Sequence, residues 1–219
     1  MRLTASCDYR LRINGEFVAH GPSVAAHDFY RVDCINIEPY LQRGENVIAV
    51  EVAGYNDDNY YLLNQPSFLQ AEVEIAGKVV AATGSDFTAY ELNHRKKDVP
   101  RLSFQRPFIE HYIISEGYDN WSLDIDWQPA EGTQPVKLAE QKAKTLISRR
   151  VPYPDYSMHE ATQLPDNKYT YKFKCNSTGF LGMEITVKEP TVMKLHFDEL
   201  LDEKGRVRFN SQFEGRMFY

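Results

Sequence analysis

Residues 9–18, with the sequence YRLRINGEFV, decide the fold class of this chain. From Tyr9 to Ile13, apolar and polar side chains alternate, and this period of two is typical of a strand with one buried face. Asn14-Gly15 follows directly, and both residues tolerate the positive φ angles of a type I′ turn. Apolar residues resume behind the turn. The stretch therefore predicts a β-hairpin whose apolar face lies on a core.

Further strand patterns follow the hairpin at short intervals. In Val47–Val52, Ile48, Val50 and Val52 share one face, while Glu51 marks the more hydrated face. Strands at this spacing are typical of an antiparallel sandwich or jelly roll. The other segments with strand character are Cys34–Glu38, Ser67–Ile75, Val79–Ala82 and Phe87–Leu92.

Size and charge limit the class of protein. The chain has 219 residues, enough for one large β domain or two small ones. Its hydrophobic content of 42% is sufficient for a packed core, so general disorder is not expected. A formal net charge of −6 argues against nucleic acid as the partner, because phosphate binding needs a clustered basic face. The compact basic run His94–Lys97 is interpreted as a solvated loop.

Signals for metals, disulfides, membranes and export are weak in the sequence. Cys7, Cys34 and Cys175 are too few for a disulfide framework, and without a CxxC pair no zinc site is predicted. No other metal or cofactor is predicted either. The sequence has no apolar run long enough to span a membrane. The residues after Met1 do not form an apolar signal core, so no export signal is predicted, and a periplasmic or secreted parent protein remains open.

The composition changes after the first β region, where prolines and glycine bracket a polar segment. We predict a jelly-roll domain over residues 1–128, a linker over 129–155 and a partial second β-sandwich over 156–219. Within the linker, Val136–Ile147 fits a helix and an extended chain equally well. The second β region is predicted from clean alternation in Tyr169–Cys175, Leu181–Val187 and Met193–Phe197.

Two groups of segments carry a resemblance to a known family. The first group comprises Tyr9–Val18, Gly21-Pro22, Arg31–Asp33, Ile37–Leu41 and Gly44–Val52, and the second comprises Asn176–Val187, Leu195–Leu201 and Gly205–Val207. The first resembles the N-terminal galactose-binding-like jelly roll of bacterial α-L-rhamnosidases of glycoside hydrolase family 78, with its YRLYVNGEFV..GP hairpin and GENVIAVEV strand. The second is similar to the next β-sandwich of that family. Arg149–Pro152 matches the family's interdomain R.iP segment, which favours an extended linker.

The resemblance implies an all-β fold: a galactose-binding-like jelly-roll sandwich followed by a second, incomplete β-sandwich. Family enzymes are implied to cleave terminal α-L-rhamnose by inversion, using one carboxylic acid and one carboxylate. Both acids belong to an (α/α)6 barrel that follows the second sandwich, and this chain ends before it. No catalytic residue is therefore carried over.

The expected function is that of a non-catalytic N-terminal fragment of a rhamnosidase-like glycoside hydrolase. It would serve as a scaffold or contact carbohydrate, with the missing catalytic barrel domain as its partner. The sequence neither predicts nor excludes an enzyme activity of the chain itself. The alternatives are a free-standing carbohydrate-binding module and a structural interaction domain.

One loop combines the residue types of a carbohydrate site. Tyr55, Asp57, Asp58, Tyr60 and Tyr61 offer aromatic rings for stacking on a rhamnose-containing glycan and carboxylates for its hydroxyls. Because Asp is common in turns, an ordinary solvated loop is the alternative interpretation.

Overall fold

The computed structural model describes residues 1–58, 62–103, 106–130, 133, 135–136, 138–140, 142–165 and 167–207. The chain divides into two compact units. The first combines Met1–Lys96 with Tyr112–Pro152, and the second combines Lys97–His111 with Tyr153–Tyr219.

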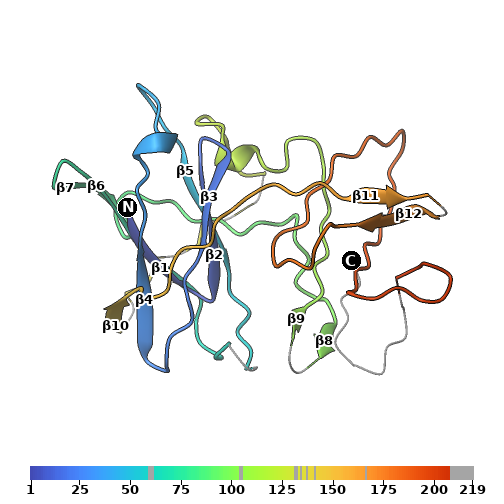
Figure 1. Ribbon diagram of the computed structural model, residues 1–219. Helices are drawn as coiled ribbons and strands as arrows, with labels where there is room; N and C mark the ends of the chain where they lie inside the picture. Colours follow the sequence, from blue (N-terminus) through green and yellow to red (C-terminus); the bar gives the residue numbers. More distant parts are fainter. Residues whose placement is uncertain are drawn as a thin grey trace. The chain divides into compact units, whose positions relative to one another are not determined.

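One sheet of the first unit has five strands in the order β10-β4-β1-β6-β7 (Figure 1). All neighbours are antiparallel except β10 and β4, which run parallel. The strands are β1 (Arg2–Ser6), β4 (Phe29–Cys34), β6 (Phe68–Ile75), β7 (Lys78–Ala82) and β10 (Thr145–Ser148).

The other sheet of the first unit is built on the predicted hairpin. Its order is β3-β2-β5, with β2 (Asp8–Ile13), β3 (Glu16–Gly21) and β5 (Ile48–Ala53) all antiparallel. The turn between β2 and β3 has φ angles of 52° at Asn14 and 81° at Gly15, so the prediction of a turn with two positive φ angles is confirmed. The chain passes from the five-stranded sheet to this one at Cys7.

The hydrophobic core takes its side chains from both sheets, which makes the first unit a β-sandwich. In β2 the burial alternates along the strand, and Leu11 and Ile13 are fully buried. Burying one such side chain contributes about 1.5–3 kcal/mol to stability. Because two sheets share this core, the predicted all-β sandwich class is confirmed. Core residues on strands of the five-stranded sheet are Leu3, Ala5, Ala71 and Val73, and those on the three-stranded sheet are Tyr9, Leu11, Ile13, Val18 and Ala19.

Two strand predictions in this unit are wrong. A strand was expected over Cys34–Glu38, but the observed strand β4 spans Phe29–Cys34. It therefore ends at the residue where the predicted strand begins. The chain continues into the short 3-10 helix η1 (Glu38–Tyr40), whose Pro39 supplies the fixed φ that suits a helical first turn. In Phe87–Leu92 the structure has only an isolated bridge, between Tyr90 and Pro135. The second 3-10 helix, η2, spans Asn120–Ser122.

The helical alternative for Val136–Ile147 is wrong for the described residues of that segment. The segment instead ends in β10, where Ile147 lies beside Arg31 of β4. Backbone hydrogen bonds to the edge of the sheet stabilise this segment more than helix formation would, because an isolated helix of this length is only marginally stable in water. The limits proposed for the domains and the linker stay a prediction.

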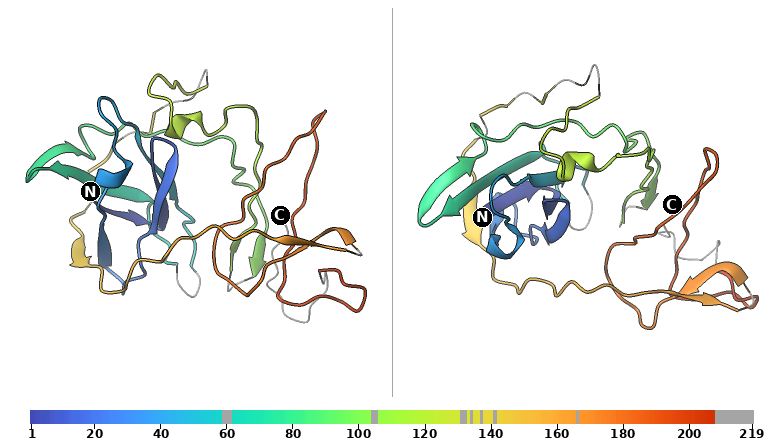
Figure 2. Two further views of the ribbon diagram at one scale, coloured as in Figure 1. Left: turned by 45° about the horizontal axis from the view of Figure 1, so that its top comes forward. Right: turned by 90° about the horizontal axis from the view of Figure 1, so that it is seen from above.

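In the second unit, the described residues form two two-stranded sheets. These are β8 (Arg101–Ser103) with β9 (Arg106–Phe108), and β11 (Thr162–Leu164) with β12 (Asn167–Lys172). Figure 2 shows the β11–β12 hairpin followed by chain without regular structure. The strands predicted over Leu181–Val187 and Met193–Phe197 are therefore wrong. Strand backbone needs partners for its N–H and C=O groups, and among the described residues these segments contain a single bridge position, His196, and no paired strand.

Across the described ranges, no helix is both long enough and apolar enough to cross a membrane.

Candidate functional site

The outer face of the β3-β2-β5 sheet carries charged groups instead of core residues. Because side chains alternate along β2, Arg10 points away from the core that Leu11 enters. Arg10 Nη2 lies 2.7 Å from Glu51 Oε2, and the two side chains are only 27% and 14% exposed. Glu51 was expected to mark the more hydrated face of its strand, but the structure half-buries it in this ion pair.

An aromatic and cationic group covers this ion pair. We call it the Tyr112 cluster; it consists of Tyr55, His94, Arg95, Tyr112 and Tyr118. Arg10 Nη2 donates to the Tyr112 hydroxyl at 3.5 Å. The Arg95 guanidinium carbon lies 5.7 Å from the Tyr112 ring centre and 6.0 Å from that of Tyr55. Cation–π contacts of this kind contribute about 0.5–1 kcal/mol at exposed sites.

Histidine and tyrosine rings extend the cluster toward solvent. His94 stacks on Tyr112 with ring centres 6.0 Å apart and meets Tyr118 edge-on at 5.5 Å. The Ile113 amide donates to the His94 carbonyl at 2.7 Å, which ties the two segments together. Tyr118 is 39% exposed, so part of the cluster can touch a ligand. The arrangement suits contact with a flat, partly apolar molecule.

The expectation of a solvated loop at His94–Lys97 is therefore wrong for His94 and Arg95, which are half-buried. Their partners come from distant positions in the sequence, Tyr55 and Tyr112. No local sequence pattern around Arg95 indicates these partners, so the cluster could not be predicted from the sequence.

The five residues proposed for carbohydrate binding have different positions. Tyr55 joins the Tyr112 cluster. Asp58 Oδ1 accepts a hydrogen bond from the Asn64 amide at 2.8 Å, so it closes its own loop. Asp57 is half-buried on the same loop. Tyr60 and Tyr61 lie outside the described residues. Sugar binding by this loop stays a prediction.

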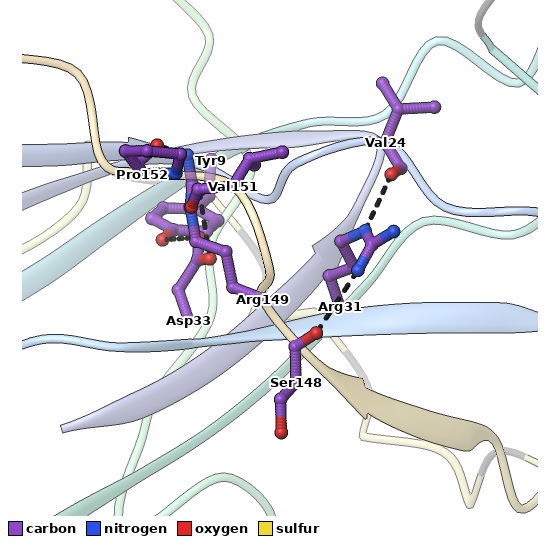
Figure 3. Close-up of polar contacts among 8 residues, drawn as sticks. All are labelled: Tyr9, Val24, Arg31, Asp33, Ser148, Arg149, Val151 and Pro152. Carbon is purple, nitrogen blue, oxygen red and sulfur yellow. Dashed lines mark hydrogen bonds and ion pairs between the residues drawn. The ribbon is translucent and has the colours of Figure 1, made fainter.

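A second polar network lies inside the sandwich (Figure 3). The Tyr9 hydroxyl donates to Asp33 Oδ2 at 2.5 Å, and Arg149 Nη1 donates to Asp33 Oδ1 at 3.0 Å. Asp33 is fully buried, and the Arg149 side chain is only 9% exposed. A Cβ on Gly21 would collide with Asp33 and Tyr9, so the glycine leaves room for the network.

Arg149 also holds the backbone that leaves the first unit. Its Nε and Nη2 atoms donate to the carbonyls of Val151 and Pro152 at 2.9 and 3.0 Å (Figure 3). A buried charge without a partner is costly, so the Asp33–Arg149 pair requires residue 149 to stay in place. This makes the network a structural anchor for the segment after β10. Sequence reasoning placed Arg149 in a motif but did not pair it with Asp33.

Burial also shifts the pKa values of several groups in this unit, among them Asp8, His20 and His94. Desolvation raises the pKa of Asp8, and the nearby charge of His20 opposes this shift. Desolvation lowers the pKa of His20, against the opposing charge of Asp8. His94 likewise has a lowered pKa, chiefly because of burial. Neutral His94 is the form that stacks in the cluster near physiological pH.

Two hollows lie on the surface of the first unit, one beside the N-terminus and one between β4 and β10. An inverting enzyme needs two carboxyl groups about 6.5–9.5 Å apart across one bond. The hollow beside the N-terminus has one carboxylate in its lining, Glu74, and the hollow between β4 and β10 has none. Neither hollow therefore supplies the pair. Within the described part of the chain, no group of three or more His, Cys, Asp or Glu side chains is arranged to hold a metal ion.

Comparison with known proteins gives one informative match. No family profile and no curated protein matches the chain. A solved structure does: the crystal structure of a GH78 family rhamnosidase of Bacillus sp. GL1, with 26% sequence identity and a TM-score of 0.52. This chain is similar to a GH78 rhamnosidase. The match covers 69% of this chain and 16% of that chain, so the similarity concerns a small part of the larger protein.

Proposed function

We propose that this chain is a non-catalytic N-terminal β-sandwich part of an α-L-rhamnosidase-like glycoside hydrolase. The observation that carries the proposal is the similarity to the GH78 rhamnosidase structure, over 69% of this chain but only 16% of that one. The β-sandwich of the first unit and the sequence resemblance described above support the same parentage. A galactose-binding-like jelly roll is the form of sandwich that the resemblance implies.

In this role the first unit acts as a rigid scaffold. The buried Asp33–Arg149 pair holds the segment that leaves the sandwich, which suits a module that must present a following domain in a defined way. The acids that cleave the glycosidic bond belong, in this proposal, to a helical barrel outside this chain.

The proposal is tested by activity and by the gene. Purified chain incubated with an aryl α-L-rhamnoside should release no rhamnose above the level of a heat-denatured control. The reading frame after codon 219 should encode a long, largely helical region. Release of rhamnose that one Asp or Glu substitution within this chain abolishes would overturn the proposal, as would a following frame without a helical domain.

A second candidate function is carbohydrate binding by the Tyr112 cluster. The observation that favours it is the partly exposed Tyr118 ring, which contacts His94 edge-on in the cluster beside the half-buried Arg10–Glu51 ion pair. Isothermal titration with L-rhamnose should show weak binding that Tyr118→Ala removes. Tyr156→Ala, which changes a similarly exposed ring of the second unit, is the matched control and should leave binding intact. Equal binding by both variants would exclude the cluster as the site.

A further inference from the structure

A hollow of about 460 Å³ lies where β10 joins the edge of the five-stranded sheet. Its volume is in the range of small-ligand sites. All of its lining residues belong to the first unit: Ala26, Phe29, Arg31, Ile147, Ser148 and Arg150.

The parallel pairing of β10 with β4 places the aromatic and cationic side chains of this hollow together. In the register, Thr145 lies opposite Phe29 and Ile147 opposite Arg31. Residues two apart on a strand share a face, so Phe29 and Arg31 project on the same side of the sheet. Phe29 is 44% exposed, which leaves its ring available to a ligand.

Arg31 is fixed in this hollow by neutral groups. Its Nε donates to the Val24 carbonyl at 3.0 Å, and its Nη1 donates to the Ser148 carbonyl at 3.2 Å (Figure 3). A guanidinium has five N–H donors, so these two bonds leave donors for a further acceptor. They also orient the group without a compensating negative charge.

The charge of the lining is one-sided. Arg31 and Arg150 both line the hollow, and none of its lining residues is acidic, although the whole chain has a net charge of −6. Asp28, the acid next to Phe29 in the sequence, is not part of the lining and lies 3.7 Å from the ring of His27. Asp33, further along β4, is buried and paired with Arg149.

We infer that this hollow binds the carboxylate-bearing unit of an acidic glycan, such as a hexuronate. The carboxylate lies against the guanidinium groups of Arg31 and Arg150, whose planar fork matches two carboxylate oxygens. The sugar ring lies on the exposed face of Phe29. This site is separate from the Tyr112 cluster and does not depend on the function proposed above.

The test is a titration of the isotope-labelled full chain with D-glucuronate, followed by NMR and repeated by calorimetry. Binding should saturate with a dissociation constant on the order of 1 mM, which is the strength expected of an open site. The amide signals of Phe29 and Ile147 should shift, whereas those of Tyr112 and Tyr118 should not. Glucose, the neutral counterpart, should bind at least about tenfold more weakly, because it lacks the charge-assisted bonds.

Matched variants separate a specific site from general charge. Arg150→Met should weaken glucuronate binding about tenfold, since it removes one charge-assisted partner. Arg43→Met removes the same charge from an exposed position outside the hollow and should leave binding unchanged. Phe29→Leu should weaken binding of the hexuronate more than binding of acetate, which has no ring.

Several outcomes would overturn the inference. These are the absence of saturable binding, equal affinity for glucose and glucuronate, and equal losses in Arg150→Met and Arg43→Met. Tighter binding of glucose 6-sulfate than of glucuronate would contradict the carboxylate assignment. Thermal unfolding of each variant confirms that the protein titrated is folded.

Discussion

The two units of this chain use the same sequence pattern with opposite results. In β2, Leu11 and Ile13 alternate with arginines and are completely buried. Leu181, Met183, Ile185 and Val187 alternate just as regularly, yet each is between 48% and 53% exposed and none lies in a strand. The difference is that β2 has β3 and β5 as hydrogen-bonded neighbours and a second sheet above it. An alternating pattern indicates which face a strand would bury. The segment forms a strand only where neighbouring strands supply its backbone hydrogen bonds.

The largest expected difference between the units concerns their ion pairs. Asp33→Ala leaves the Arg149 charge buried without its partner, so it should lower the free energy of unfolding by about 3–5 kcal/mol. Asp202→Ala breaks the exposed i, i+4 pair with Arg206 in the second unit and should have no resolvable effect. Urea unfolding followed by far-ultraviolet circular dichroism, which reports on the backbone of both units, measures both. Equal effects would contradict the assignment of Asp33–Arg149 as an anchor.

Core substitutions should divide the units in the same way. Leu11→Ala opens a cavity between two sheets and should cost about 2–5 kcal/mol. Leu181→Ala shortens a half-exposed side chain and should change stability by no more than about 0.5 kcal/mol. The comparison uses the same unfolding experiment on the full chain. A large loss of stability in Leu181→Ala would mean that residues 181–187 are packed in solution. The two units would then not differ in how they use alternating sequence.

The smallest expected effect is a pH dependence of the first unit. Burial lowers the pKa of His20, so between the ordinary value of 6.5 and the lowered one the unfolded chain binds a proton that the folded chain does not. Stability therefore falls as the pH decreases from about 7.5 to 5.5. His20→Gln should reduce this fall, measured as the difference in melting temperature between the two pH values.

The control for this experiment is His27→Gln, which changes an exposed loop histidine. It should keep the pH dependence of the unchanged protein. Asp8, whose pKa burial raises, contributes with the opposite sign. Because the charge of His20 lowers that pKa, His20→Gln enlarges the opposing contribution and reduces the fall further, whereas His27→Gln leaves the His20–Asp8 pair intact. An unchanged pH dependence in His20→Gln would show that His20 is not buried as described.

The sandwich was predictable where the signals were local. The hairpin at Asn14-Gly15 and the strand over Ser67–Ile75, which the structure shows as β6 (Phe68–Ile75), both follow from neighbours in the sequence. The misplaced strand over Cys34–Glu38 shows the limit of local patterns. Ile35 and Ile37 suggest a strand, but the pairing of β4 with β1 ends before them and Pro39 begins a 3-10 helix. The aromatic loop was recognised, but its partner Arg95 lies 40 positions away from Tyr55 and carries no sign of the contact.

The all-β class, the buried face of β2 and the resemblance to rhamnosidases can all be recognised from the amino-acid sequence, because each depends on the order of nearby residues. The partners of the charged groups depend on the folded structure: Asp33 pairs with Arg149, Arg10 pairs with Glu51, and Arg31 donates to the Ser148 carbonyl of β10. These contacts join residues that are distant in the chain, and their strength depends on burial that no local pattern records. The same physics decides which alternating segments become strands.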